Sequence, residues 1–477
     1  MKILNEKGAV GFDTTYDPCL DLFAKLGSFP REPNDEQMEV LRDLTRKAFL
    51  FNEKETAILL FNLRDRLEGV GHRKVFRELF WFAIQFCPTF EKLIPLIPEY
   101  GRWDDLLNLL HSKYKSVVAD LVRKQLAKDL MSNNPSLLGK WMPSINTSSK
   151  EAKTLANILA KELGLKPADY RKTCSRLRKR IGIVEHNICT QNFEDLKYSN
   201  VPSLAMSKYT NIFETKDKDN YHKFLDDVVN GKAKINTATL NVVDMALSAD
   251  KERVSADLLN AQFDNLPDFG ECKSLVCMDG SGSMYTERYK VRPIDVAKSL
   301  TIYCSTRNEV YKNQFITFGD EVKFVTLKST NFCDKIKELS KYDDCGTTNF
   351  ENVFLQILNH AKFYNLTEDQ MIKNLIVVSD MQFDDPCCFK YANDSVYRKL
   401  QELFKAEGYE MPKIIFWNVG ASVAMPITVD DYNATILSGW SQNMLRYILS
   451  GSEITPRLIL NEVLESKRYA KIAEIFG

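Results

Sequence analysis

The hydrophobic pattern of the chain changes its period near residue 269, and no other feature constrains the fold as strongly. Before this point, apolar residues recur at the spacing of amphipathic helices, as in segments 56–68, 75–85 and 116–130. After it, short apolar runs alternate with helical segments. The sequence therefore predicts packed helices followed by an α/β sheet.

The first half is expected to be a helical repeat domain over residues 34–268, after an extended N-terminal arm at 1–33. Further helices are predicted at 103–111, 152–163 and 170–181, and Pro88, Pro95 and Pro98 should keep the intervening helices short. Because no strand-like alternation interrupts these segments, we expect packed helix pairs in an α-solenoid arrangement.

The second half is expected to hold a doubly wound, mainly parallel sheet over residues 269–430. Strands are predicted at 274–278, 313–318, 321–327, 374–379 and 413–419, and helices at 293–307, 349–361 and 395–406. Residues 431–477 are predicted to form a helical extension, with helices at 441–449, 456–465 and 469–476. These helices either complete the α/β domain or pack on the helical one.

Polar residues follow the predicted strands where a doubly wound sheet places its ligands. Asp279, Ser281 and Ser283 come directly after the first strand, Thr348 precedes a helix, and Asp380 ends the 374–379 strand. Hydroxyl and carboxylate oxygens suit Mg²⁺ or another divalent cation. The alternative is that Asp279 and Ser283 only cap a turn and a helix, but capping explains one loop and not three.

One predicted helix carries an unusual run of positive charge. No acid lies between Asp169 and Glu185, while Tyr170, Cys174, Leu177 and Ile181 mark a single apolar face. The run is either a solvated helix face or a surface for a phosphate backbone. The residues that would contact RNA are Arg171, Lys172, Arg176, Arg178, Lys179 and Arg180.

The neutral total charge hides an asymmetry that supports the second interpretation. The chain has 64 Lys+Arg and 64 Asp+Glu. Residues 111–210 contain 18 Lys+Arg and 8 Asp+Glu, a net of +10, which leaves 46 against 56, a net of −10, for the rest. A nucleic-acid surface is therefore expected in the helical half.

Cysteine usage and apolar run length bear on the compartment. The 11 Cys show no regular spacing, and no apolar signal segment opens the chain, so reduced, buried thiols are expected in the cytoplasm. The longest apolar runs, such as residues 79–87, are shorter than the roughly 20 residues that cross a bilayer, so no membrane association is expected.

No motif of a common enzyme class is present. The sequence has no phosphate-binding loop, no nucleophile elbow and no zinc-protease motif, and its five His lie far apart. A metal-dependent phosphodiesterase built on Asp279, Asp380 and Asp384 is the version of an enzyme that conflicts least with the sequence. We expect a protein that is not an enzyme.

The three polar loops resemble the metal-ion-dependent adhesion site (MIDAS) of von Willebrand factor A domains. The matching elements are Asp279-Gly-Ser-Gly-Ser283, Gly346-Thr-Thr-Asn349 and Ser379-Asp380. The resemblance implies a Rossmann-like fold with metal ligands at Asp279, Ser281, Ser283, Thr348 and Asp380. Either Thr347 or Thr348 fits, and Thr348 is preferred because it precedes Asn349.

The whole chain resembles Ro-like proteins, which join a HEAT-like helical repeat of the TROVE type to such an A domain. Local matches are Tyr100-Gly-Arg-Trp-Asp104 and residues 204–208. A closer resemblance is to an uncharacterised family of eukaryotes and giant DNA viruses. It is carried by Gly139-Lys-Trp-Met-Pro-Ser-Ile145, Arg176-Leu-Arg-Lys-Arg180, residues 198–209, Val378-Ser-Asp-Met-Gln-Phe-Asp384 and Gly439-Trp-Ser-Gln-Asn443.

The resemblance implies a non-catalytic ribonucleoprotein component that binds small structured RNAs or single-stranded RNA ends. Trp141, Tyr170 and Tyr209 are candidates for stacking on unpaired bases, although burial in the core is an alternative for each. The second hypothesis is a protein interaction scaffold that captures an acidic side chain through the metal. The expected location is the cytoplasm, and also the virion if the chain is viral.

Overall fold

The computed structural model describes residues 2–4, 10–12, 14–27, 29, 31–251, 254–269, 273–286, 291–308, 310–318, 322–342, 350–381, 395–420, 434–445 and 455–477. The chain divides into two compact units. Unit 1 comprises Met1–Leu59, Glu68–Val70 and Thr237–Ala470, and unit 2 comprises Leu60–Leu67, Gly71–Asn236 and Lys471–Gly477. Most of unit 2 is thus inserted into the sequence of unit 1. The division into four consecutive segments stays a prediction.

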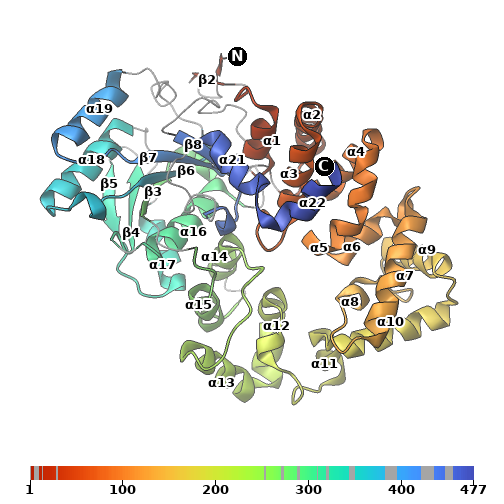
Figure 1. Cartoon of the computed structure of the whole chain (residues 1–477). Coiled ribbons are helices and arrows are strands. Elements are labelled where there is room, and N and C mark those ends of the chain that lie inside the picture. The colour runs from red at the N-terminus through yellow and green to blue at the C-terminus, as the bar shows by residue number, and fades with distance from the viewer. Residues whose placement is uncertain are drawn as a thin grey trace. The chain divides into compact units, whose positions relative to one another are not determined.

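The described strands of the second half form one mixed sheet in unit 1, in the order β5-β4-β3-β6-β7-β8 (Figure 1). Neighbouring strands are parallel except β5, which pairs antiparallel with β4. Chain order runs outward from β3 in both directions, so it reverses between β3 and β6. The strand bounds are β3 Ser274–Asp279, β4 Gln314–Phe318, β5 Lys323–Thr326, β6 Asn374–Ser379, β7 Lys413–Asn418 and β8 Ala434–Ser438.

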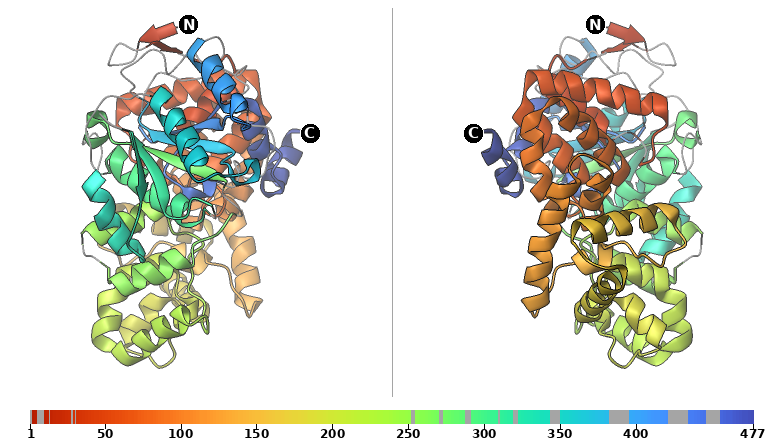
Figure 2. Two further views of the ribbon diagram at one scale, coloured as in Figure 1. Left: turned by 90° about the vertical axis from the view of Figure 1, so that its left-hand side faces the viewer. Right: turned by 90° about the vertical axis from the view of Figure 1, so that its right-hand side faces the viewer.

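Helices cover both faces of this sheet, which explains why its strands read as continuous apolar runs. Every residue of β3 is buried. Leu275 and Cys277 of β3 join the core formed with α18 (Phe350–Phe363) and α19 (Ser395–Ala406). These two helices lie in front of the sheet in the left view of Figure 2. The other face is covered by α16 (Pro293–Thr306), which packs on β3, β4 and β6.

The predicted α/β half is therefore confirmed, with one strand added. β7 was expected to be the last strand, but β8 pairs in parallel with it. β8 is the last strand in the sheet order, is five residues long and reads Ala-Thr-Ile-Leu-Ser, so it lacks the longer apolar run of β3, β6 and β7. The turn expected to join β4 to β5 lies outside the described residues. The assignment to von Willebrand factor A domains stays a prediction.

Further helices of unit 1 surround the sheet. Near α16 lie α14, α15 and α17, and Asn241, Ser255 and Asn331 cap the N-termini of these three helices through their side chains. The bounds are α2 Asp35–Phe51, α14 Val242–Asp250, α15 Ala256–Asp264, α17 Phe332–Leu339 and α21 Pro456–Leu464.

The prediction of an extended arm at 1–33 is wrong for residues 18–26, which form helix α1 (Pro18–Leu26). Asp17 caps this helix and Pro18 occupies its first turn, a start signal that the sequence contains. α1 packs against β8 and α21, and the Ser438 hydroxyl donates to the carbonyl of Phe23. Before α1, the short strands β1 (Lys2–Leu4) and β2 (Val10–Phe12) pair antiparallel.

The C-terminal helices divide between the two units. α21 packs on β8 and α1 in unit 1. Most of α22 (Ala470–Phe476) belongs to unit 2, where the ring of Phe476 contacts that of Phe90 and Lys471 pairs with Glu99. The C-terminal helices were predicted either to complete the α/β domain or to pack on the helical one. α21 does the first, and most of α22 does the second. The expected helix at 441–449 appears as a 3₁₀ segment, Gln442–Leu445, in its described part.

The predicted helices of the first half are confirmed, with ends that shift by a few residues. α3 (Glu53–Arg64) begins in unit 1 and ends in unit 2. The HEAT-like repeat architecture stays a prediction. Unit 2 contains α4 Arg73–Phe86, α5 Ile97–Tyr100, α6 Trp103–Leu107, α7 Lys115–Met131, α8 Leu138–Trp141, α9 Lys150–Glu162, α10 Pro167–Ile181, α11 Val184–Thr190, α12 Ser203–Lys216 and α13 Lys218–Val229.

A buried ionic network explains the Tyr100-Gly-Arg-Trp-Asp104 segment of unit 2. Asp105 is fully buried and accepts hydrogen bonds from Arg64 Nε (2.8 Å), Arg77 Nε (2.7 Å) and the amide of Arg102 (2.9 Å). Gly101 is required here, because a Cβ at this position would lie 2.5 Å from Oδ2 of Asp105. The network ties together the ends of α3, α4 and α6.

Two expectations about composition can be compared with the structure. Within the described parts of the chain, the cysteines are free thiols, and all are buried except Cys189 of α11, which is exposed. Cys272, Cys345, Cys387 and Cys388 lie outside the described residues. Among the described helices, none combines the length and apolar composition that crossing a bilayer requires.

Candidate functional site

The first candidate site lies where β3 and β6 end, at the point where the strand order reverses. Asp279 is the last residue of β3, and Asp380 directly follows β6. The two strands are parallel neighbours, so their carboxyl ends meet at one edge of the sheet. Doubly wound sheets bind their ligands at such a position.

Four of the five predicted metal-shell residues come together here. The Ser281 amide donates to Asp279 Oδ1 (2.8 Å), and the hydroxyl oxygens of Ser281 and Ser283 lie 3.1 Å apart. Ser283 Oγ also donates to Asp380 Oδ1 (3.3 Å), which links the loop after β3 to the loop after β6. Thr348 and its alternative Thr347 lie outside the described residues.

Neighbouring groups fix both carboxylates in place. Ser379 Oγ donates to Asp279 Oδ2 (2.5 Å) and accepts from the amide of Met381 (3.0 Å). Gly420, after β7, lies against Asp380, and a Cβ there would come within 2.5 Å of the Asp380 Cβ. Asp279 is fully buried and Asp380 is 5% exposed. The oxygens are therefore preorganised by the packing of the strand ends.

This set of oxygens differs from the sites that soft transition metals prefer. Among the described residues, no group of three or more His, Cys, Asp or Glu side chains could hold a metal ion. Asp279 and Asp380 supply carboxylates, and Ser281 and Ser283 supply neutral hydroxyls. Such a hard shell with few formal charges fits Mg²⁺ better than Zn²⁺.

The second candidate site is the basic helix α10 of unit 2. Tyr170, Cys174 and Leu177 are buried and Ile181 is half-buried, so the predicted apolar face is confirmed. Pro167 opens the helix, and Gly182 ends it in the left-handed conformation with φ of 64°. The charged residues must therefore occupy the remaining faces of α10.

Two of the six predicted RNA contacts also hold the fold together. Arg178 Nε donates to the carbonyl of Gly139 (3.1 Å), and its Nη2 donates to that of Met142 (2.7 Å). Arg180 donates to the carbonyls of Leu130 and Ser132 at the end of α7. These guanidinium groups satisfy carbonyls at helix ends, which lack partners within their own helices. The sequence did not reveal this role, because the carbonyls lie 36 to 50 residues away in sequence.

The other four cations point to solvent. Arg171, Lys172, Arg176 and Lys179 are exposed. In the part of the chain that the structure describes, their side chains form no ion pair or hydrogen bond with one another or with other residues. Four like charges on one helix repel each other unless an anion neutralises them. Their binding to RNA stays a prediction.

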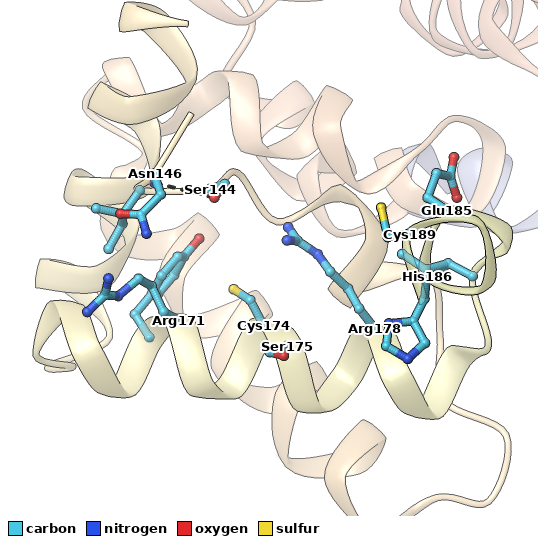
Figure 3. Close-up of a pocket in the computed structure, with 12 residues that line it drawn as sticks. Ser144, Asn146, Arg171, Cys174, Ser175, Arg178, Glu185, His186 and Cys189 are labelled. Atoms are coloured by element: carbon cyan, nitrogen blue, oxygen red, sulfur yellow. Dashed lines mark hydrogen bonds between the residues drawn. The ribbon is translucent and has the colours of Figure 1, made fainter. Parts of the chain in front are cut away.

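A pocket of about 360 Å³ opens beside this surface. Figure 3 shows Arg171 and Arg178 extending toward it from α10, between Ser144 and Asn146 at one end and α11 at the other. The sequence suggested no role for Ser144 and Asn146, although Ser144 lies in the Gly139-Lys-Trp-Met-Pro-Ser-Ile145 segment that carries the family resemblance. On α11, Glu185, His186 and Cys189 also line the pocket.

The three aromatic residues proposed to stack on bases differ in access. Tyr170 is buried, and its hydroxyl donates to the carbonyl of Pro143 (2.8 Å), while burial raises the pKa of this phenol. The guanidinium of Arg102 lies 3.9 Å from the centre of the Trp141 ring. Tyr209 is half-buried and donates to Glu185 (3.3 Å). The core alternative therefore holds for Tyr170, whereas Trp141 and Tyr209 keep exposed area.

Comparison with known proteins gives relatives for both parts of the chain. Residues 273–471 match a family model described as a domain of unknown function, DUF7788, and residues 114–266 match another, DUF2828. The DUF2828 match ends and the DUF7788 match begins near residue 269, where the sequence predicts the change from helical to α/β structure.

A relative with a matching sequence comes from a giant virus. The chain is 25% identical over 509 residues to the uncharacterized protein L728 of Acanthamoeba polyphaga mimivirus, across 96% of this chain and 86% of that protein. The expected giant-virus relative is thus confirmed. Among solved structures, the Deinococcus radiodurans RO (RSR) protein aligns over 94% of this chain and 99% of its own, with a TM-score of 0.41 and 11% identity.

Proposed function

We propose that the chain is a non-catalytic RNA-binding protein of the Ro type that its sequence motifs resemble. The observation that carries the proposal is the solvent-facing cation group of α10, made of Arg171, Lys172, Arg176 and Lys179. The α10 cations lie on a segment of net charge +10, so the surrounding potential also attracts a polyanion.

The pocket beside α10 favours single-stranded RNA as the ligand. Proteins read unpaired bases by taking them out of the stack into pockets, while cations hold the flanking phosphates. The pocket of about 360 Å³ lies beside Arg171, and it offers Ser144, Asn146 and Glu185 as hydrogen-bonding groups. Arg178 shapes the pocket and is held by two carbonyls, so it positions the site in addition to any contact with RNA.

The test is the salt dependence of RNA binding. Fluorescence anisotropy with a labelled single-stranded RNA should give a dissociation constant that rises steeply between about 50 and 200 mM salt. Replacing the four α10 cations by Gln should flatten the slope of log Kd against log salt by about 3, since each phosphate contact to a single strand contributes about 0.7.

A matched control has the same charge change elsewhere in unit 2. Lys216, Lys218, Lys223 and Lys232 are exposed residues of α12, α13 and the loop after α13, and their replacement by Gln should leave the slope unchanged. The proposal fails if the wild-type protein shows no salt-dependent RNA binding. It also fails if the control weakens binding as much as the α10 variant does.

A second function is proposed for the loops after β3 and β6. There, the Ser283 hydroxyl lies 3.1 Å from that of Ser281 and 3.3 Å from Asp380 Oδ1, and both Ser281 and Asp380 are buried. With Asp279, and with Thr348 as a further predicted ligand, they fit Mg²⁺ or a similar divalent cation. A cation held by few formal charges stays electrophilic and would bind the carboxylate of an acidic protein partner.

Thermal unfolding tests the metal site without knowledge of the partner. Mg²⁺ should raise the melting temperature of the wild-type protein in a concentration-dependent way, because an ion that binds only the folded state stabilises it. Ser283→Ala should weaken this response, and Ser340→Ala, a control on the exposed 3₁₀ segment Ser340–Tyr342, should keep it. An identical response to Mg²⁺ in all three proteins would count against the site. Capture of a partner by this site should be abolished by EDTA.

A further inference from the structure

A second pocket of unit 1, of about 440 Å³, lies at the opposite edge of the sheet from Asp279. Asn313 lines it just before β4 begins, and Lys328 lines it after β5 ends. Since β4 runs parallel to β3 and β5 runs antiparallel, both residues lie at the amino-terminal edge of the sheet. The pocket is therefore separate from the candidate metal site.

Positive charge dominates the lining of this pocket. Arg307, Lys312, Lys328 and Lys335 line it together with two carboxylates, Asp264 and Asp268, so four cations face two anions and the net charge is +2. Lys335 is 5% exposed, and its ammonium group donates to Asn313 Oδ1 (2.9 Å). An ammonium group carries three donors, so further donors of this buried group are available to a ligand.

The charge of Lys335 is costly without a ligand. Burial is the main cause that lowers the pKa of this lysine; Lys312 and Arg307 lower it further, while the carboxylates of Asp264 and Glu338 raise it. A buried cation beside other cations favours an anion that neutralises them together. The same electrostatic argument applies to exposed cations only weakly, because water screens them.

The walls of the pocket are held in position before any ligand arrives. The rings of Phe263 and Phe332 stack with centroids 4.4 Å apart, and the Arg307 guanidinium lies 4.9 Å from the Phe263 ring centre. Arg307 also donates to the carbonyl of Phe263 (3.1 Å). The carboxylate of Glu338 accepts hydrogen bonds from the amides of Lys328 and Ser329, which fixes the loop after β5.

We propose that this pocket binds a small phosphomonoester, with the phosphate beside Lys335, Lys312 and Lys328. A phosphomonoester carries close to two negative charges at neutral pH, which matches the net charge of the lining. The volume exceeds that of a phosphate group, so the organic part of the ligand lies in the pocket as well. The flat Phe263 and Phe332 rings provide an apolar wall for it.

Calorimetric titration of the full-length protein with AMP, adenosine and inorganic phosphate tests the proposal. AMP should bind and adenosine should not, because the phosphate supplies the attraction to the lysines. Binding of inorganic phosphate, weaker than that of AMP, would support a role of the apolar wall. Binding of AMP should weaken as the pH falls below about 6, where the phosphate loses its second charge.

Two variants and a matched control locate the site. Lys335→Met should weaken AMP binding by about tenfold or more, the usual effect of losing one charge-assisted hydrogen bond, and Lys312→Met should weaken it by about threefold because water screens its charge. Lys312 is exposed, so its variant also tests the proposal if Lys335→Met does not fold. Lys337→Met removes an exposed charge from the same helix, α17, outside the pocket lining and should leave AMP binding unchanged.

The outcomes separate this site from the RNA surface. The α10 variant, whose changes lie in unit 2, should bind AMP like the wild-type protein. The proposal is overturned if AMP does not bind at millimolar concentration, or if adenosine binds as tightly as AMP. It is equally overturned if Lys337→Met weakens binding as much as Lys312→Met.

Discussion

Removal of the Asp105 carboxylate should destabilise unit 2 more than removal of any exposed acid. Asp105→Ala deletes the acceptor of hydrogen bonds from Arg64, Arg77 and the Arg102 amide. It leaves Arg64, whose side chain is 2% exposed, as a buried cation without this partner. The desolvation that lowers the pKa of Arg64 would then lack its main compensation.

The burial of this ion pair determines how much unfolding free energy Asp105→Ala should lose. Breaking a buried ion pair by removing one partner costs about 3–5 kcal/mol, because the remaining charge stays out of water. Asp120→Ala is the matched control. Asp120 pairs with Arg123 one turn away on α7, and its side chain is 63% exposed. An exposed pair of this kind contributes about 1 kcal/mol or less.

Urea unfolding followed by circular dichroism measures the difference. With slopes of about 1–3 kcal/mol per molar urea, a cost of about 3–5 kcal/mol means that Asp105→Ala should lower the midpoint of the helical transition by about 1–5 M. The double variant Arg64→Met with Asp105→Leu should lose less than Asp105→Ala, because it leaves no unpaired Arg64 charge. Equal midpoints for Asp105→Ala and Asp120→Ala would refute the reasoning.

Three further predictions follow from single contacts. Arg178→Gln should lower the free energy of unfolding, measured by urea titration, by about 2 kcal/mol because two hydrogen bonds to carbonyls are lost. The control Arg176→Gln should change this free energy by less than about 0.5 kcal/mol. Burial lowers the pKa of His360, which stacks on Phe324, so the unfolded state binds the proton more readily. Stability should therefore fall as the pH drops through 6.5, and this dependence should flatten in His360→Phe, measured as midpoints at about pH 7.5 and about pH 5.5. Gly420→Ala should reduce the Mg²⁺-dependent rise in melting temperature, because its Cβ would displace Asp380, and an unchanged rise would contradict the packing argument.

The sequence predicted best those strands that are covered on both faces of the sheet. Strands β3, β6 and β7 are covered on both faces, so they read as apolar runs, and the polar residues at their ends could be located. Since parallel strands end at one edge, Asp279 and Asp380 were expected to meet, and the structure places them together. Local chemistry and sheet topology were sufficient for this part of the site.

Long-range partners could not be read from the sequence. The hydrophobic pattern placed Arg178 and Arg180 on the charged side of α10, but their carbonyl partners depend on how α7 and α8 pack. Strand β8 was missed because Ala434, Thr435 and Ser438 leave it without an apolar run, although all five of its residues are buried. Asp17 and Pro18 form a helix start that the sequence contains, and the prediction of an extended arm did not take it into account.

The position of α1 has a consequence for biosynthesis. This helix leaves the ribosome long before β8, the strand that it covers, because the contacting residues Phe23 and Ser438 lie 415 positions apart in the sequence. The α/β unit therefore cannot complete its core until β8 has been made, and until then the apolar face of α1 lacks this partner. A fragment that starts at residue 269 would lack α1, and we expect it to expose β8 and to aggregate.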